Sequence, residues 1–403
     1  MENIEKRRFT HTKICVDKKK EGKQMRKTLA MLLAVLLGLS VTACSGTNEG
    51  ENAQQSETNS ESTGSTDVSE QKGMVLDNTA TEETANLELP VSGLGRFIET
   101  DVKADKPYKI GLIVKNNTNP YMALAADGAK KAAEDMGFEI NIQAPATADS
   151  VEEQVSIMES MIESGIDAFV TIPVDSNGIV PAVKKADENK IPVAAIGTAP
   201  ATEIFLRTGA DYYPSGTEIA KAMFEKAGGK GGLVIIEGPS GAQNSIERLQ
   251  GITDVLADYP DIELLASQPA NFNRVQGMTV MENLLQQEGM SDKLTMVIGC
   301  NSEMAIGAYQ AIKAAGLEKQ VMIGTFDGFK DDVAMVESGE FYCTYNMDPY
   351  SATYLACCYL VQYLNDGTSP DYNFIPFPTA QDGLLITTDN VQEFLDTKAS
   401  WDD

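Results

Sequence analysis

The chain has 403 residues, of which 42% are apolar, and its formal net charge at pH 7 is −27. This length and apolar content suffice for two or three domains with sizeable cores. The excess of acidic residues argues against a nucleic-acid partner, because phosphate binding requires clustered Lys and Arg. The six cysteines lack a spacing typical of metal ligands, such as two CxxC pairs, so we expect neither a metal site nor a cofactor.

The first 44 residues have the pattern of a secretion signal. The basic start Met25-Arg26-Lys27 is followed by the apolar stretch Leu29–Val41 and by small residues before Cys44. The apolar stretch is too short to cross a bilayer, which takes about 20 residues. We therefore predict a signal peptide over residues 1–44, and Met25 is a candidate for the true start.

Val41-Thr42-Ala43-Cys44 resembles the lipobox of bacterial lipoproteins, in which the cysteine carries lipid and becomes the first mature residue. The alternative is an ordinary signal peptide with an incidental cysteine. Residues 45–106 are rich in Ser, Thr, Glu, Asn and Gly, so they are predicted to form a disordered acidic tether. We expect a protein that is anchored by lipid to the cell membrane of a bacterium and folded outside the cytoplasm.

Short apolar stretches alternate with helical patterns from Tyr108 onward. The first unit consists of the apolar stretch Lys109–Val114, a polar loop, and a helix that begins at Pro120 with Asn119 as its N-cap. Such a loop, at the carboxyl end of a buried parallel strand, is where open α/β sheets bind ligands. The sequence therefore predicts that this loop contributes to a binding site.

The strand–loop–helix unit recurs in two series that are separated by a break at 207–213. Further strands are expected at 138–143, 168–172, 193–196, 233–236, 262–267, 296–300, 321–325 and within 374–386. Further helices are expected at 150–164, 177–189, 243–258, 274–287, 304–315, 331–337 and 350–364.

Two βαβ series of similar size predict an α/β protein with two doubly wound parallel-sheet lobes. The first lobe is expected to contain 107–208 and 348–367. The second is expected to contain 209–347 and 368–395, followed by a tail at 396–403. The chain would thus cross three times between the lobes.

Six blocks between Tyr108 and Ile386 occur in the order of a known family. They are Asn119-Pro120-Tyr121, Pro173-Val174-Asp175-Ser176, Ile191-Pro192-Val193, Ala266–Arg274, Asn301–Ala305 and Gly324–Gly328. With these blocks the chain resembles the periplasmic ribose-binding family, the class I solute-binding proteins of ABC transporters. The resemblance implies the fold of a type I periplasmic binding protein, with two lobes joined by a three-strand hinge that close on a sugar.

The resemblance also implies a set of ligand contacts. By position, Asn119, Arg248, Phe272, Asn301 and Asp327 match ligand-contacting residues of the family. Their chemistry agrees with this role, because Asp, Asn and Arg exchange hydrogen bonds with hydroxyls and an aromatic ring packs on a sugar's apolar face. The structural alternatives are an Asx turn, a helix cap, a surface salt bridge and ordinary burial. Lys115, Tyr121 and Thr198 complete the predicted ligand-binding set.

Several positions depart from the pattern of the ribose-binding family, among them Lys115, where a small polar residue is usual, and Ser302, where Asp is usual. Gly197-Thr198 replaces its Asp-Arg pair, Ile172 replaces an Asn, and Met347 replaces a hinge Gln. A hydrogen bond to a charged group contributes roughly 1.5–3 kcal/mol, so these losses predict weak ribose binding. Lys115 would restore one charged donor. We therefore expect a monosaccharide-sized polyol other than ribose as the ligand.

The implied function is capture of a small sugar or polyol and its delivery to the permease subunits of an ABC importer, by a protein that we expect to be a monomer. A sensing module that presents its closed form to a receptor kinase or chemoreceptor remains an alternative. Cleavage at Cys44 would remove His11, the only histidine, and with it any Ser-His-Asp, Cys-His or His-zinc chemistry. A carboxylate-based glycosidase is the minor alternative, and we expect no enzyme.

Overall fold

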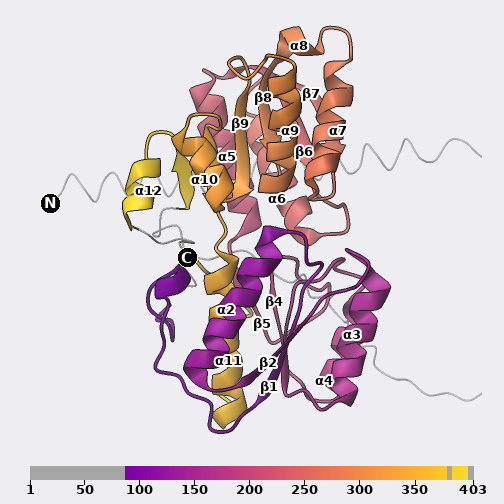
Figure 1. Cartoon of the computed structure of the whole chain (residues 1–403), viewed down its shortest axis with the longest axis vertical. Helices are drawn as coiled ribbons and strands as arrows, with labels where there is room; N and C mark the ends of the chain where they lie inside the picture. The colour runs from indigo at the N-terminus through magenta and orange to yellow at the C-terminus, as the bar shows by residue number, and fades with distance from the viewer. Residues whose placement is uncertain (1–86, 379–383, 398–403) are drawn as a thin grey trace, which may run out of the picture. The chain divides into compact units, whose positions relative to one another are not determined.

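The structure, a computed structural model, describes residues 87–378 and 384–397. Two six-stranded sheets organise these residues (Figure 1). The first has the strand order β11-β5-β4-β3-β1-β2 and the second has the order β12-β10-β9-β8-β6-β7. All strand pairs are parallel except β10 with β12. The predicted α/β fold with two parallel-sheet lobes is confirmed.

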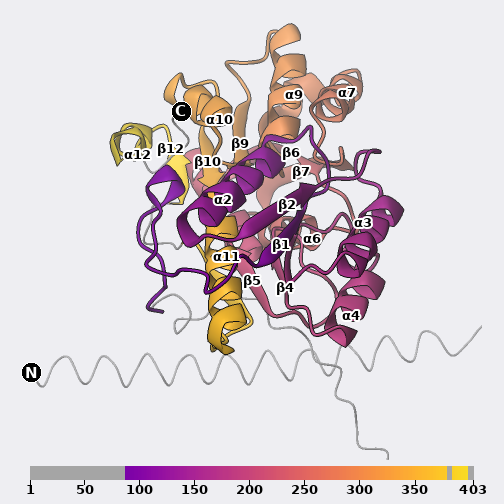
Figure 2. The ribbon, with the colours of Figure 1, turned by 60° about the horizontal axis from the view of Figure 1, so that its bottom comes forward.

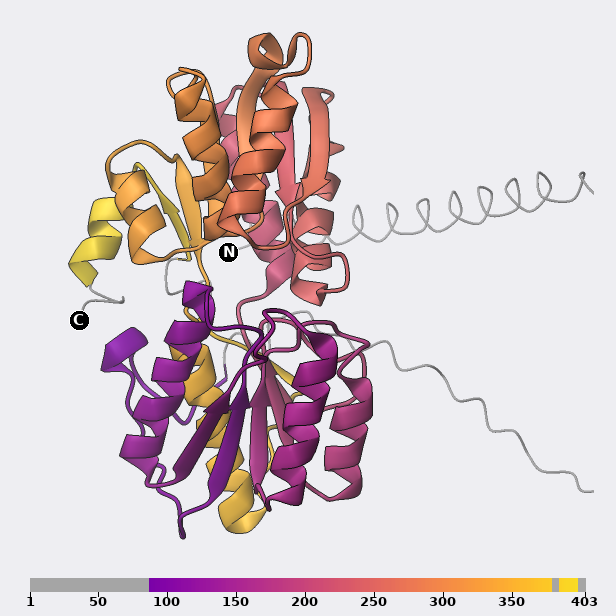
Figure 3. The same cartoon turned by 45° about the vertical axis from the view of Figure 1, so that its right-hand side comes forward.

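The first lobe is built around the first sheet. Its strands are β1 (Lys109–Ile113), β2 (Glu139–Gln143), β3 (Ala168–Thr171), β4 (Val193–Ile196), β5 (Leu206–Gly209) and β11 (Phe374–Pro376). Its helices are α2 (Pro120–Met136), α3 (Val151–Glu163), α4 (Val180–Glu188) and α11 (Pro349–Asp366). Helices α2 and α11 cover one face of the sheet and α3 and α4 cover the other (Figures 2 and 3). Both faces of the central strands are therefore buried, which explains the apolar sequences of β1, β3 and β4.

The second lobe repeats this plan. Its strands are β6 (Lys230–Glu237), β7 (Asp261–Pro269), β8 (Leu294–Gly299), β9 (Met322–Asp327), β10 (Cys343–Asn346) and β12 (Leu385–Thr387). Its helices are α5 (Tyr212–Lys226), α6 (Gln243–Leu256), α7 (Arg274–Leu285), α8 (Met290–Lys293), α9 (Ser302–Ala314), α10 (Lys330–Glu337) and α12 (Val391–Thr397). Helix α5 packs on α6, and α7 packs on α9.

The chain passes between the two sheets at three places, and the last differs from the sequence prediction. The passes run from β5 to α5, from β10 to α11 and from β11 to β12. Residues 368–395 were all expected in the second lobe, but Phe374–Pro376 pairs with β5 in the first sheet. Gly367 is the left-handed C-cap of α11, with φ 82°. It therefore marks the end of that helix and not the point at which the chain passes to the second lobe.

The expected break at 207–213 is also partly wrong. Residues Leu206–Gly209 form β5, a buried strand between β4 and β11 in the first sheet. Arg207 and Thr208 are polar, so β5 lacks the apolar sequence expected of a buried strand. Their polar groups are paired with residues of α11 and of the second lobe, which are distant in the sequence. Thr208 Oγ1, for example, donates to the Ala352 carbonyl of α11 over 2.7 Å.

Residues 87–100, called the N-terminal strap below, correct the prediction of a tether up to residue 106. The strap contains the 3-10 helix η2 (Gly95–Phe97), which packs on α11, and Ile98, which is 1% exposed. The Gly95 N–H lies 2.6 Å from Ser351 Oγ and 3.3 Å from Asp348 Oδ2, at the start of α11. A few apolar residues, together with these hydrogen bonds, thus hold the N-terminal strap on α11. The predicted signal, Cys44 and the tether up to residue 86 lie outside the described residues.

Candidate functional site

A small cavity of about 30 Å³ lies where loops from both sheets meet. Its lining residues follow the carboxyl ends of parallel strands or stand on the helices that come next, which is where α/β sheets bind ligands. From the first lobe they are Lys115, Asn119, Tyr121, Met122, Ile172 and Gly197, and from the second Asn244, Arg248, Phe272, Asn301 and Asp327. Seven of the eight sequence-predicted ligand-binding residues are among them.

Asn119 and Asn301 hold equivalent places in the two lobes. Asn119 is the N-cap of α2, and its Oδ1 accepts the Tyr121 N–H over 2.9 Å. Asn301 is the N-cap of α9, and its Oδ1 accepts the Met304 N–H over 2.9 Å. Asparagine is favoured at N-caps because its side-chain oxygen satisfies a free helix N–H. Capping thus fixes both side chains at the cavity and leaves each amide nitrogen as a donor.

Arg248 and Asp327 form a buried ion pair in the second lobe. Arg248 Nη2 lies 3.5 Å from Asp327 Oδ1, and Nη1 donates to the Cys300 carbonyl over 2.6 Å. The guanidinium carbon lies 4.6 Å from the centre of the Phe326 ring. Burial raises the pKa of Asp327, whereas the charge of Arg248 and the N–H of Ser302 lower it. Arg248 is therefore not part of a surface salt bridge.

Lys115 starts a hydrogen-bond chain that joins the two lobes. Its Nζ donates to Thr198 Oγ1 over 2.7 Å, and Thr198 Oγ1 donates to Asn244 Oδ1 over 3.1 Å. Lys115 is 5% exposed, and its Nζ lies 5.6 Å from the centre of the Phe272 ring. Burial lowers its pKa to about 8, against an opposing effect of Asp149. Thr198, the eighth predicted residue, thus touches the site through Lys115 and does not line the cavity.

The sequence analysis missed Asn244. Arg248, which it predicted, lies on the same helix α6, four residues further along the chain. Residues four apart lie on one face of a helix, so a polar residue one turn before Arg248 was a usable signal. Met347, which replaces the family's hinge Gln, is buried but does not line the cavity.

Phe272 is held in the cavity wall by an unusual loop. Asn271 and Phe272 have φ values of 52° and 56°, a left-handed conformation that is uncommon for residues other than glycine. The ring packs against Gly238, where an added Cβ would lie 2.3 Å from ring atom Cε1. Gly238 at the end of β6 therefore makes room for the ring. Such strain is often found at binding sites.

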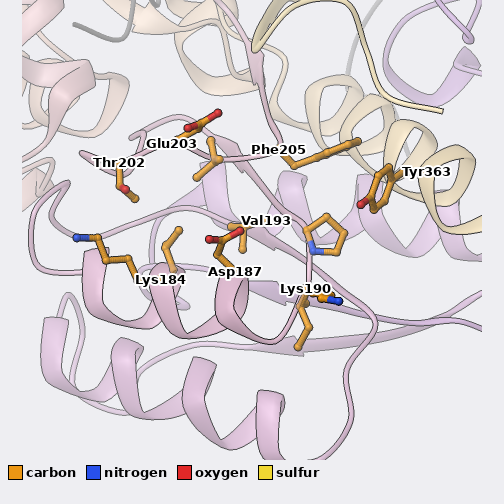
Figure 4. Close-up of a pocket in the computed structure, with 12 residues that line it drawn as sticks. Lys184, Asp187, Lys190, Val193, Thr202, Glu203, Phe205 and Tyr363 are labelled. Carbon is orange, nitrogen blue, oxygen red and sulfur yellow. The ribbon is translucent and has the colours of Figure 1, made fainter. Parts of the chain in front are cut away.

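A larger cavity of about 550 Å³ lies on the first lobe, between α4 and the loop before β5 (Figure 4). Its lining includes Lys184, Asp187, Lys190, Phe205 and Tyr363. It is situated near the amino ends of β4 and β5, opposite the ends at which α/β sheets bind ligands. A third cavity, of about 370 Å³, adjoins the site and shares Lys115, Asn119, Met122 and Phe272 with it. The site itself is therefore the smaller cavity.

Neither a metal centre nor a membrane span is found in the part of the chain that the structure describes. There, no group of three or more His, Cys, Asp or Glu side chains could hold a metal ion. None of the described helices is both long and apolar enough to cross a bilayer. Cys300, Cys343, Cys357 and Cys358 are buried free thiols, and burial raises the pKa of each.

Residues 110–369 match the family model described as periplasmic binding protein domain. The ribose import binding protein RbsB of Bacillus subtilis is 35% identical over 60% of this chain and 77% of that protein. The xylitol-binding protein of Mycolicibacterium smegmatis is 35% identical over 47% of this chain, and the match spans only 54% of that protein. Among solved structures, an ABC transporter solute-binding protein from Actinobacillus succinogenes with bound D-allose matches with a TM-score of 0.66 and 26% identity, over 71% of this chain and 99% of that one.

Proposed function

This chain belongs to the periplasmic binding protein domain family, and from that premise we propose that it captures a small sugar or polyol between its lobes and delivers it to an ABC importer. The observation that carries the proposal is the meeting of residues from both lobes at one cavity, Asn119 from the first and Arg248, Asn301 and Asp327 from the second. Relatives named as ribose- and xylitol-binding proteins support a polyhydroxylated ligand. They are named as binding proteins, which agrees with a protein that is not an enzyme.

The chemistry of the lining suits one small amphipathic molecule. The Arg248–Asp327 pair offers a fork of donors beside an acceptor, which matches adjacent hydroxyls. Phe272 offers an aromatic face, and Met122 and Ile172 supply apolar wall. Sugars carry hydroxyls at their edges and C–H groups on their faces, so they fit this combination.

The size of the cavity implies movement. Sites for small molecules usually enclose roughly 300–1,000 Å³, and this one encloses about 30 Å³. A monosaccharide therefore enters only if the lobes separate, and closure afterwards would bring Asn119 and Arg248 to the same ligand. The passes from β5 to α5 and from β10 to α11 are where rotation would occur.

We place the protein outside the cytoplasm, tethered through a lipid on Cys44. The family supports an extracytoplasmic location, and the signal-like pattern before Cys44 motivates the anchor. We also propose that the acidic segment before residue 87 serves as a tether, which would let the folded part reach its transporter.

A thermal-shift screen of pentoses, hexoses, deoxy sugars, inositols and linear polyols tests the binding function. A ligand that binds only the native state raises the melting temperature by an amount that depends on its concentration relative to Kd. Calorimetry then measures the affinity of each positive compound. A flat response to the whole set would overturn the proposal. Delivery is tested by deleting the gene, which should abolish uptake of the identified ligand until the wild-type protein is restored.

A further inference from the structure

The site is rich in hydrogen-bond donors because each of its three asparagines uses its side-chain oxygen within the protein and keeps its amide nitrogen. Asn119 and Asn301 use Oδ1 as helix caps. Asn244 uses Oδ1 to accept from Thr198 Oγ1 and from the Ser245 N–H, each over 3.1 Å. A backbone N–H can only donate, so each amide orientation is fixed by its partner. All three residues line the cavity, and each keeps an amide nitrogen, which can only donate, that these hydrogen bonds do not use.

Acceptors are scarce in comparison. Among the lining residues, Asp327 is the only carboxylate. Its Oδ2 already accepts the Ser302 N–H over 3.1 Å, and its Oδ1 faces Arg248. A neutral sugar hydroxyl must donate as well as accept, so a pocket built for several such hydroxyls needs several acceptors. This pocket instead favours ligand groups that only accept.

The charges of the lining residues also favour a ligand group that accepts hydrogen bonds, and in particular an anion. Lys115, Arg248 and Asp327 are the charged residues of the lining, so two cations face one anion. Arg248 is paired with Asp327, and Lys115 makes no ion pair within 4.0 Å in the described part of the chain. The nearby acids are engaged elsewhere: Asp149 accepts from Asn116 Nδ2 and Asp175 accepts the N–H groups of Asn177 and Gly178. A buried cation without an anionic partner is costly.

We propose that the ligand of this site is a sugar acid, a monosaccharide-sized polyhydroxy carboxylate whose carboxylate pairs with Lys115 while its hydroxyls meet the Arg248–Asp327 pair. The inference rests on the proposed function and names the chemical class of its ligand. A carboxylate accepts without donating, which matches the amide nitrogens. It also neutralises the surplus positive charge. Charge-assisted hydrogen bonds of this kind are about twice as strong as neutral ones.

Calorimetry on the mature full-length chain, with sugars and acids of matched stereochemistry, tests the inference. Suitable pairs are galactose with galacturonate and galactonate, glucose with glucuronate and gluconate, and xylose with xylonate. We expect at least one acid to bind about 10-fold to 100-fold more tightly than its neutral partner. If neutral sugars bind and every acid binds more weakly, the inference fails and the proposed function stands. If no member of any pair binds, the inference fails, and the proposed function fails with it only if the full thermal-shift screen is also flat.

Variants of Lys115 separate its charge from its bulk. Lys115→Met should reduce the acid-to-neutral affinity ratio by about 10-fold or more, whereas Lys115→Arg should keep a preference for the acid. Lys190→Met, which removes an exposed lysine from the distant cavity of Figure 4, is the matched control and should leave the ratio unchanged. Circular dichroism confirms that each variant is folded. An unchanged ratio in folded Lys115→Met would overturn the assignment.

The pH dependence provides a readout that a structural lysine would not give. The polar and charged groups that act on Lys115 are Thr198, Asp149, Asp175 and Arg248, and burial lowers the pKa of Lys115 to about 8. A bound carboxylate would raise that pKa. Affinity for the acid should therefore be constant from pH 6 to 7.5 and fall above pH 8, as the free lysine loses its proton. Affinity for an acid that stays constant up to pH 9.5 would contradict the proposed pairing.

Discussion

Arg207 of β5 and Glu247 of α6 form an ion pair between the two lobes, with 3.6 Å between Nη2 and Oε2. The Arg207 side chain is 1% exposed and that of Glu247 is 20% exposed. The guanidinium carbon also lies 4.4 Å from the centre of the Phe374 ring and 5.1 Å from that of Tyr212. Glu247 directly precedes Arg248 on α6. The same turn of this helix therefore carries one residue that pairs with β5 of the first lobe and one that lines the ligand site.

We expect Glu247→Gln to lower the free energy of unfolding by about 3 kcal/mol, because it removes the carboxylate that pairs with the buried guanidinium of Arg207. Urea denaturation followed by circular dichroism measures the change. The control is Glu263→Gln, which breaks an ion pair to Lys293 between side chains that are 60% and 57% exposed. That change should cost less than about 1 kcal/mol. Equal effects of the two substitutions would refute the role of the hinge pair.

Asp327→Ala should weaken ligand binding by at least about 100-fold, since it removes the only carboxylate of the lining and leaves Arg248 unpaired. Calorimetry with the ligand found in the screen gives the ratio. Asp331→Ala removes an acid of the same lobe whose side chain is 74% exposed, and it should bind as the wild type does. Full affinity in a folded Asp327→Ala protein would exclude this residue from the site.

The N-terminal strap is expected to be part of the folded unit. Ile98→Ala should lower stability by about 2–5 kcal/mol, the usual cost of truncating a buried Ile, because Ile98 is 1% exposed. Its neighbour Phe97 is 52% exposed, so Phe97→Ala should be close to neutral. Urea denaturation of the two variants provides the comparison. If neither variant is destabilised, the strap behaves as a tether, as the sequence analysis expected.

Ligand binding should close the lobes. Small-angle scattering is expected to show a smaller radius of gyration at saturating ligand, because rotation at the passes near Gly209 and Met347 brings the two sheets together. Asp327→Ala at the same ligand concentration should show no contraction. A wild-type radius that does not change, with binding confirmed by calorimetry, would mean that the ligand enters without hinge motion.

Cys44→Ser should abolish lipid attachment, because the hydroxyl cannot replace the thiol that carries the lipid. We expect the variant to be released into the medium or to remain unprocessed. Membrane fractionation and mass spectrometry distinguish these products, with Ser45→Ala as the control that retains the cysteine. Equal membrane retention and mass for Cys44→Ser and the wild type would refute the anchor.

The sequence determined the parts of this protein that depend on local signals. Uninterrupted apolar stretches such as Ile110–Ile113 identify strands that are buried on both faces. Asn119-Pro120 and Asn301 mark the starts of helices, because capping needs only neighbouring backbone. Parallel strands bring such loops to one edge of each sheet. The resemblance to the ribose-binding family named most of the ligand-binding set, and seven of the eight predicted residues line the cavity.

Only the tertiary structure decided features whose energy comes from residues distant in the chain. Strand β11 has three residues, and its place in the first sheet depends on β5. The strap is held by Ser351 and by the face of α11, some 250 residues away. Asn244 belongs to the site because Thr198 of the other lobe holds its oxygen. In each case the deciding partner is far away in the sequence, so no local pattern carries the information.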